Sequence, residues 1–384
     1  MARFTIPRDV YFGEGTIEEL KNLKGKRAAI VIGGSAVKKN GALEKVEKFL
    51  KEAGMETTLI EGVEADPSVK TVMSGVEVMN NFQPDWIIGL GGGSPMDAAK
   101  AMWIFYEYPE FTFEEAAKPF NLPELRQKSK YAAIPTTSGT GSEVTSFAVI
   151  TDTETGVKYP IADFNITPDI AIVDTDLAQS MPAKLVAHTG MDALTHSLEA
   201  YVSTMSNELT DALAMKSIEM IQDYMVESFK GDENSRAKMH ISQCLAGMSF
   251  SNAILGIVHS MAHKTGKIFE VPHGCANAIY LPIAIEFNSE VAGAKYADVA
   301  RRLGLEGAKE EELVKSLVQF VRDLNKAMNI PRTLKEFGVE EAKFLANLED
   351  ISKNAVADPC TGTNPREISV EQMKELFNRA YYGA

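Results

Sequence analysis

Short apolar runs alternate with amphipathic stretches along the first half of the chain. The runs are AAIVIGG (28–34), TTLIEGV (57–63), DWIIGLGGG (85–93), YAAIPTT (131–137) and DIAIVD (169–174). Segments between them, such as GALEKVEKFLKEAG (41–54), carry apolar residues at helical spacing. Near-continuous apolar strands separated by helices are typical of a parallel sheet that is covered on both faces. The pattern therefore predicts an α/β domain with a parallel sheet.

The pattern of apolar residues changes after about residue 176, from strand-like runs to helical segments. SFAVITDTETGVKYPI (146–161) still predicts a β-hairpin around a Thr155-Gly156 turn. Beyond it, strand-like runs become scarce, and Met- and Ala-rich helical segments follow at 208–229 and 236–266. We place a boundary at the SMPAK turn, which gives an α/β domain over 1–180 and an all-α domain over 181–384.

Composition and charge narrow the class of protein. The net charge of −14 argues against nucleic acid, which needs basic clusters. The three cysteines are far apart and form neither a metal knuckle nor a disulfide framework. The N-terminal segment lacks the apolar core of a signal peptide, and no run reaches the ~18 apolar residues that a membrane span needs. We expect a cytoplasmic protein without a membrane or nucleic-acid partner.

A glycine run follows the third apolar stretch, in IIGLGGGSPMDAAKA (87–101). Three glycines let backbone N–H groups approach a ligand. Ser94 suits the N-cap, and Pro95 suits the first turn, of a helix whose N-terminus attracts phosphate. The plainer alternative is a tight strand–helix turn without a ligand, but three consecutive glycines favour a pyrophosphate site. PTTSGTGSEVT (135–145) is a second polar loop after a strand, and a ligand that crosses the strand ends would contact both loops.

Four of the six histidines fall in three short stretches of the second half. Asp192 and His196 stand one helical turn apart, and His259 and His263 repeat that spacing before His273. Any one of these histidines alone is better explained as a buried, hydrogen-bonded residue. The set favours a metal, and imidazole with carboxylate suits Zn²⁺ or Fe²⁺ rather than Ca²⁺ or Mg²⁺. The remaining two histidines, His188 and His240, are interpreted as structural or surface residues.

These motifs, together with VHSMAHKTGKIFEVPHGCANAIYLP (258–282), resemble the iron-containing (group III) alcohol dehydrogenase family. The similarity runs from VYFGEGTIEEL (10–20) to DPCTGTNPREIS (358–369). The resemblance implies a dinucleotide-binding N-terminal domain and a helical metal-binding C-terminal domain, the architecture shared with dehydroquinate synthase. It also implies oxidation of alcohols or reduction of aldehydes and ketones with NAD(H) or NADP(H).

The resemblance also assigns roles to individual residues. The metal ligands would be Asp192, His196, His259 and His273. His263 would be the catalytic, non-ligand histidine beside the nicotinamide. The residues at the cofactor would be Gly33, Asp66, Gly92, Gly93, Ser94, Thr136, Thr137, Thr140 and Lys158. The residues that flank the substrate would be Phe147, Phe250 and Cys360.

One departure from the family bears on the choice of cofactor. NAD-dependent relatives often carry an aspartate after the first strand that meets the ribose 2′-OH, and Gly33 takes that place here. An aspartate would repel a 2′-phosphate, whereas glycine leaves room for it, and Ser35, Lys38 and Lys39 add donors or positive charge. The sequence therefore favours NADP(H), with NAD(H) as the alternative. For the metal, the resemblance favours Fe²⁺, with Zn²⁺ as the alternative.

The two phenylalanines indicate a narrow apolar pocket. We expect a short aliphatic alcohol or aldehyde as the substrate, such as butanol or a propanediol. The competing interpretations are a dehydroquinate synthase or glycerol-1-phosphate dehydrogenase, which would need basic residues for a charged substrate, and a non-catalytic metal- or dinucleotide-binding protein. The resemblance also implies a homodimer.

Overall fold

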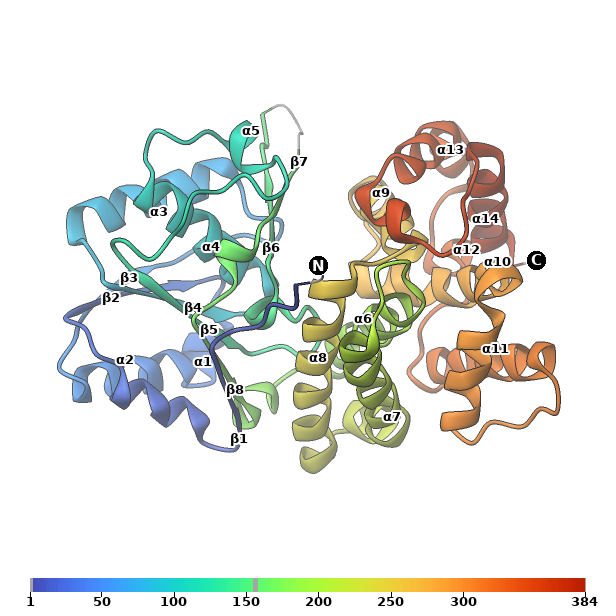
Figure 1. Cartoon of the computed structure of the whole chain (residues 1–384), viewed down its shortest axis with the longest axis horizontal. Coiled ribbons are helices and arrows are strands. Elements are labelled where there is room, and N and C mark those ends of the chain that lie inside the picture. The colour runs from blue at the N-terminus through green and yellow to red at the C-terminus, as the bar shows by residue number, and fades with distance from the viewer. Residues whose placement is uncertain (1–2, 155–157, 384) are drawn as a thin grey trace. The chain divides into compact units, whose positions relative to one another are not determined.

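The structure is a computed structural model that describes residues 3–154 and 158–383, without the side chain of Lys158. The chain divides into two compact units, Met1–Met181 and Pro182–Ala384. In Figure 1 the first unit runs from blue to green and the second from green to red. The first unit is built on strands and helices, and the described part of the second consists of helices and loops.

A six-stranded, fully parallel sheet forms the centre of the first unit (Figure 1). In spatial order the strands are β1 (Asp9–Gly13), β8 (Ile170–Asp174), β5 (Lys130–Pro135), β4 (Trp86–Gly91), β2 (Arg27–Ile32) and β3 (Glu56–Ile60). The four central strands are buried along nearly their whole length. The predicted parallel sheet is thus confirmed. Edge strand β1 was not predicted, because its residues are mostly half-buried and do not form a continuous apolar run.

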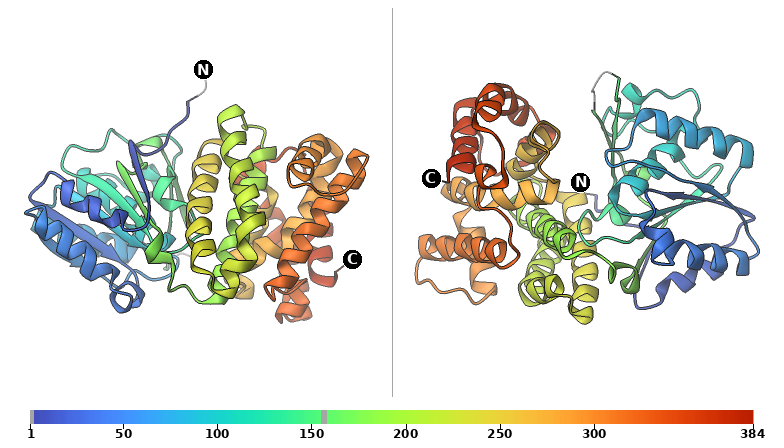
Figure 2. Two further views of the ribbon diagram at one scale, coloured as in Figure 1. Left: turned by 90° about the horizontal axis from the view of Figure 1, so that it is seen from below. Right: turned by 180° about the vertical axis from the view of Figure 1, so that it is seen from behind.

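Helices cover both faces of this sheet, as Figure 2 also shows. Side chains of β2 that alternate along the strand pack into two separate cores. Ala29 and Val31 belong to the core with α3 (Val69–Phe82) and α4 (Gly93–Glu107). Ala28 and Ile30 belong to the core with α2 (Ala42–Glu52). The short elements of this unit are η1 (Thr16–Asn22), α1 (Ala36–Lys39), α5 (Phe113–Ala116), η2 (Ser142–Val144), η3 (Phe164–Ile166) and η4 (Thr175–Ala178).

The strand order reverses between β2 and β4, because β3 lies beyond β2 on one side and β5 lies beyond β4 on the other. Ligands of open parallel sheets bind at the carboxyl ends of the strands at such a point. Gly33 follows β2 and the glycine run follows β4, so both lie at this position. The topology therefore places the predicted cofactor loops where a nucleotide would bind.

The predicted hairpin is also confirmed in the described residues. Strand β6 (Phe147–Thr151) pairs antiparallel with β7 (Lys158–Ala162). The predicted Thr155-Gly156 turn lies outside the described residues.

The second unit is helical, as predicted. Its elements are α6 (Ala183–Val202), α7 (Glu208–Lys230), α8 (Glu233–Ala253), α9 (Ile257–Phe269), α10 (His273–Arg302), α11 (Glu310–Ala327), α12 (Leu334–Phe337), α13 (Glu341–Val356), η5 (Pro359–Thr363) and α14 (Val370–Tyr382). One continuous hydrophobic core, to which α6, α7 and α10 contribute many residues, joins these helices. This core fixes the helix faces on which the histidines lie.

The helical segment predicted over 236–266 is interrupted in the structure. Helices α8 and α9 are bent by 106° at a short break. Ile254 adopts φ 62°, which is an outlier for a β-branched residue, and Gly256 follows before α9 begins. Among the described residues no single helix is long and apolar enough to cross a membrane. Helices α8 and α9 taken together meet the requirement for length and composition only.

Candidate metal and cofactor sites

Helices α6, α9 and α10 bring four predicted metal ligands together. The Nε2 atoms of His259 and His273 each lie 3.5 Å from Oδ1 of Asp192, and Nε2 of His196 lies 3.9 Å from it. Candidate ligand atoms of Asp192, His196 and His259 all lie within 4.8 Å of one another, and these three residues are buried. Four ligands arranged tetrahedrally at ~2.1 Å from a metal are about 3.4 Å apart. The donor set and its spacing fit a divalent transition metal.

Glu199 orients one of the candidate ligands from behind. Its Oε2 lies 2.5 Å from Nδ1 of His259, and its Oε1 accepts a hydrogen bond of 2.7 Å from the N–H of Val258. Gly256 leaves room for this carboxylate, since a Cβ there would lie 2.9 Å from Oε1. A carboxylate only accepts hydrogen bonds, so in the neutral His259 ring the hydrogen lies on Nδ1, and the Nε2 lone pair is left for a metal.

Asn277 contacts the cluster from α10. Its Nδ2 donates to Oδ1 of Asp192 at 2.7 Å and lies 3.2 Å from Nε2 of both His259 and His273. Sequence reasoning missed Asn277 and Glu199. Their spacing in the sequence could have indicated them. Glu199 lies seven residues after Asp192, and Asn277 lies four residues after His273, so each shares a helical face with a predicted ligand.

The Asp192 carboxylate supplies a negative charge that a cation would stabilise. Burial by itself raises the pKa of the Asp192 carboxyl, but His196, His273 and His259 hold it well below its usual range. Burial lowers the pKa of His259, yet Glu199 and Asp192 outweigh this effect and raise it to about 9. Protons therefore compete with a metal for this site.

The first residues of α10 approach α6 closely. A Cβ on Gly274 would lie 2.0 Å from the backbone oxygen of His188, so only glycine fits there. This contact sets the position of His273, the neighbour of Gly274 in the chain. It also gives His188 a structural place, at the crossing of α6 and α10.

His263 lies beside the cluster but faces a different carboxylate. Its ring stacks on that of His273 with centroids 5.7 Å apart, and its Nδ1 lies 3.1 Å from Oδ2 of Asp358. Cys360, in η5, belongs to the same group of side chains, and burial raises the pKa of its thiol well above the usual range. The thiol is therefore protonated at neutral pH.

The predicted substrate residues fall in different units. Phe250, near the end of α8, stacks on the ring of His196 with centroids 4.2 Å apart. It thus forms an apolar wall beside a candidate metal ligand. Phe147 begins β6 in the first unit, whereas Phe250 and Cys360 belong to the second.

In the first unit, the glycine run and the threonine loop pack against each other. The N–H of Thr136 donates to the carbonyl of Gly91 at 2.8 Å. A Cβ on Gly93 would lie 3.0 Å from Cγ2 of Thr140, and one on Gly92 would lie 3.4 Å from Oγ1 of Thr137. The two predicted cofactor loops are therefore in direct contact.

The start of α4 differs from the sequence prediction. Gly92 is the N-cap, so Ser94 lies inside the first turn and is not the N-cap as predicted. Since Gly92 has no side chain, it offers no capping oxygen to the N–H groups of the first turn. A phosphate oxygen would satisfy such groups well.

A buried lysine fastens the threonine loop to α4. Nζ of Lys100 donates to the carbonyls of Thr145 and Phe147, both at 2.8 Å, and to Oγ of Ser142 at 3.2 Å. Oγ of Ser142 also donates to Asp97, one turn earlier on α4, at 2.7 Å. The N–H of Ser142 donates to Oγ1 of Thr140 at 3.3 Å, which links this network to the cofactor loop.

The remaining predicted cofactor residues lie on several elements of the first unit. A Cβ on Gly33 would lie 3.2 Å from the carbonyl of Val63 and 3.8 Å from Cδ of Pro95, so Gly33 borders the first turn of α4. Asp66 is exposed in the loop before α3. Lys158 is in β7, but its side chain lies outside the described residues. Lys38, expected to add positive charge, forms an ion pair with Glu61.

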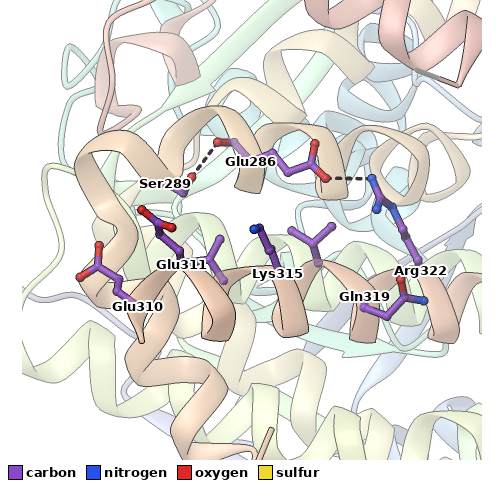
Figure 3. A pocket seen from close by; sticks show the side chains of 9 residues that line it. Glu286, Ser289, Glu310, Glu311, Lys315, Gln319 and Arg322 are labelled. Carbon is purple, nitrogen blue, oxygen red and sulfur yellow. Dashed lines mark hydrogen bonds and ion pairs between the residues drawn. The ribbon is translucent and has the colours of Figure 1, made fainter. Parts of the chain in front are cut away.

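A surface groove of 370 Å³ lies elsewhere in the second unit, between α10 and α11 (Figure 3). Glu286 forms an ion pair of 2.8 Å with Arg322 at one end of the groove. Val314 and Val318 contribute apolar side chains to its lining. No predicted site residue is among those that line it.

Comparison with known proteins gives matches over both units. Residues 7–175 match the family model described as iron-containing alcohol dehydrogenase. Residues 186–381 match the model described as Fe-containing alcohol dehydrogenase family, C-terminal.

Individual relatives match over nearly the full length. The NADPH-dependent butanol dehydrogenase of Clostridium saccharobutylicum is 59% identical, and the match covers 100% of this chain and 99% of the relative. The iron-containing alcohol dehydrogenase from Thermococcus thioreducens has a TM-score of 0.93 at 36% identity, with 100% of both chains covered. A crystal structure of 1,3-propanediol oxidoreductase has a TM-score of 0.94 at 34% identity and covers 99% of this chain and 100% of its own.

Proposed function

Because the chain belongs to the iron-containing alcohol dehydrogenase family, we propose that it interconverts butanal and butanol with NADP(H) at the Asp192–His273 cluster. The membership makes the chain an NAD(P)-dependent oxidoreductase that acts on alcohols, and confirms the resemblance seen in the motifs. The convergence of three imidazoles on Asp192 is the observation that carries the proposal.

The metal would be held by Asp192, His196, His259 and His273. Three neutral nitrogens and one carboxylate are donors that Fe²⁺ and Zn²⁺ both accept, and the family favours Fe²⁺. When bound, such an ion supplies Lewis acidity that polarises the oxygen of the alcohol or aldehyde. Glu199 would contribute by binding Nδ1 of His259, which fixes the ring and leaves Nε2 as the nitrogen that binds the metal.

His263 would exchange the proton that the reaction releases or consumes. Its ring is next to those of His259 and His273, but four other ligands complete a tetrahedral set without it. Its side chain is 37% exposed, so a proton on it can pass to water. Imidazole is the side chain best suited to such transfer near neutral pH.

The cofactor would bind at the carboxyl ends of β2 and β4. Its pyrophosphate would lie on the first turn of α4 at Gly92, Gly93 and Ser94, with Thr136, Thr137 and Thr140 lining the other side. The absence of a carboxylate at Gly33 supports NADP(H), as does the NADPH dependence of the butanol dehydrogenase relative. We propose further that Asp66 lies toward the adenosine and Lys158 toward the nicotinamide ribose.

The substrate would be a short aliphatic aldehyde or alcohol. Phe250 beside His196 supplies an apolar wall, and we propose Cys360 and Phe147 as further neighbours of the substrate. The name of the 59% identical relative supports butanal, and the propanediol oxidoreductase supports 1,3-propanediol as a second substrate to screen. The homodimer and the cytoplasmic location stay predictions.

Aldehyde reduction with each cofactor tests this proposal. The Fe²⁺-reconstituted protein would be assayed anaerobically with butanal, with NADPH and NADH in parallel. We expect kcat/KM with NADPH to be at least about tenfold higher, a difference of ~1.4 kcal/mol. A preference for NADH would overturn the assignment of Gly33, and turnover of phosphorylated polyols but not butanal would overturn the apolar substrate.

A further inference from the structure

Asp358 is the residue outside the metal cluster that is tied most directly to the proposed chemistry. It precedes η5, 95 residues after His263 in the chain, and only 7% of its surface is exposed. Its Oδ2 lies 3.1 Å from Nδ1 of His263. The sequence alone assigned it no role, although Cys360, two residues later, was predicted to flank the substrate.

The Asp358 carboxylate is held rigidly in this position. Its Oδ1 accepts a hydrogen bond of 3.0 Å from the N–H of Cys360, which makes it the N-cap of η5. Nζ of Lys264 lies 2.7 Å from Oδ2, the oxygen that also faces His263. Burial raises the pKa of the carboxyl, but His263 and Lys264 outweigh burial and hold it well below its usual range. Asp358 is therefore a carboxylate at working pH.

A separate contact fastens η5 to α9. Oγ1 of Thr361 donates to Oγ of Ser260 at 2.8 Å and is 2.7 Å from the carbonyl of Ala355. This contact does not involve the Asp358 carboxylate. A substitution of Thr361 would therefore loosen the packing of η5 and leave the carboxylate that faces His263 in place.

We infer that Asp358 is a positioning residue for His263, holding its ring so that Nε2 is the nitrogen that exchanges the proton. A carboxylate only accepts hydrogen bonds, so the His263 nitrogen that faces it, Nδ1, carries a hydrogen. In the neutral ring, Nε2 then has the free lone pair. During alcohol oxidation Nε2 takes up one proton and passes it to water, while Asp358 stays ionised. The inference rests on the proposed relay role of His263.

A purely structural role for Asp358 makes a different prediction. If the carboxylate only anchored η5, its loss would lower stability, and its effect would add to that of losing His263. If it acts through His263, its loss would lower kcat and have no further effect once the imidazole is gone. The two roles are therefore separable by a double-mutant cycle.

The test compares Asp358→Asn, His263→Ala and the double variant in butanal reduction by the metal-loaded protein. Asparagine keeps the shape and can still cap η5. Thr361→Val is the matched control for looser η5 packing, and Lys264→Met is the control for the other partner of the carboxylate. Metal content and thermal unfolding are measured for every variant, and kinetics are run well below the lowest midpoint.

We expect Asp358→Asn to lower kcat by about 10- to 100-fold, because part of the contribution of a positioned acid–base histidine is lost, with the KM for butanal changed less than threefold. The double variant should match His263→Ala, and both controls should stay within threefold of the wild type. The inference is overturned if His263→Ala lowers kcat strongly but Asp358→Asn does not, or if the two losses add. If His263→Ala itself keeps full activity, the proposed relay fails first, and the inference fails with it.

Discussion

Oε2 of Glu199 lies 2.5 Å from Nδ1 of His259, and both residues are buried. The two residues come from different helices, α6 and α9, and Gly256 leaves the space in which they meet. The pair joins the helix of Asp192 and His196 to the helix of His259. The geometry of the proposed metal centre therefore depends on a carboxylate that is not itself a proposed ligand.

Replacement of Glu199 by Gln tests this dependence. The amide removes the negative charge behind His259, so we expect metal affinity to fall about 10- to 100-fold with little loss of helicity. Competition with a chelator measures the affinity. Glu286→Gln is a control, because Glu286 bonds Arg322 and Arg379 in the α10 region. Equal affinity in Glu199→Gln and the wild type would contradict the role.

Lys100→Met tests whether burial shifts the pKa of this lysine in the first unit. Burial lowers the pKa of Lys100 to about 8, against the opposing effects of Asp97 and Glu143. Between pH 8 and the ordinary value of 10.5, the unfolded chain holds a proton that the folded chain lacks. The stability contributed by this group therefore rises with pH in that window, by up to ~1.4 kcal/mol per pH unit.

The measurement is the free energy of unfolding of wild type and Lys100→Met between pH 8 and pH 10.5. Other titrating groups, such as buried Tyr131, are common to both proteins, so the difference between the two curves isolates the lysine. The wild type should gain stability relative to the variant as pH rises. Parallel curves would show that the lysine is not shifted.

Gly33→Asp tests the choice of cofactor. The added carboxylate would repel a 2′-phosphate, and we expect kcat/KM with NADPH to fall by about 10- to 100-fold while activity with NADH is kept or raised. A Cβ at this position needs only a small shift of its neighbour, the Val63 carbonyl at 3.2 Å. Gly34→Ala is the matched control, since nothing lies within 4 Å of its Cβ. An unchanged NADPH preference would place the 2′-phosphate elsewhere.

Two glycine substitutions should have opposite effects on stability. Gly274→Ala drives a methyl group against the His188 carbonyl, 2.0 Å away, and should destabilise the protein by about 1–3 kcal/mol and weaken metal binding through His273. Gly266→Ala, within α9, meets only the Val271 carbonyl at 3.5 Å and should stabilise by roughly 0.5–1 kcal/mol. Chemical denaturation of both variants measures the effects. A neutral Gly274→Ala would mean that α6 and α10 can separate at no cost.

The sequence predicted the elements that have a strong local signal. The central strands are continuous apolar runs, and the ligand pairs at helical spacing were visible without a structure. Edge strand β1 gave no such run, and the break at Ile254 fell inside a stretch with uniform helical character. The local sequence pattern predicts neither the edge strand nor the helix break, because both depend on packing against segments that are distant in the chain.

The supporting residues of the sites were beyond sequence reasoning for a similar reason. Glu199, Asn277 and Asp358 act through partners 60, 85 and 95 residues away in the chain. A glutamate or asparagine on a helix is ordinary until the fold shows what faces it. Ser94 was predicted as an N-cap from its residue type, whereas the glycine before the helix takes that position because the backbone turns there.

Metal dependence of the reaction tests the central claim most directly. The protein would be stripped with a chelator, and activity with butanal and NADPH would be followed anaerobically during titration with Fe²⁺ or Zn²⁺, for the wild type and for His259→Ala. We predict that wild-type activity is absent without metal, rises linearly and saturates at one ion per chain, and that His259→Ala regains none. Full activity of the stripped protein, or full recovery of His259→Ala, would contradict a metal centre at these residues.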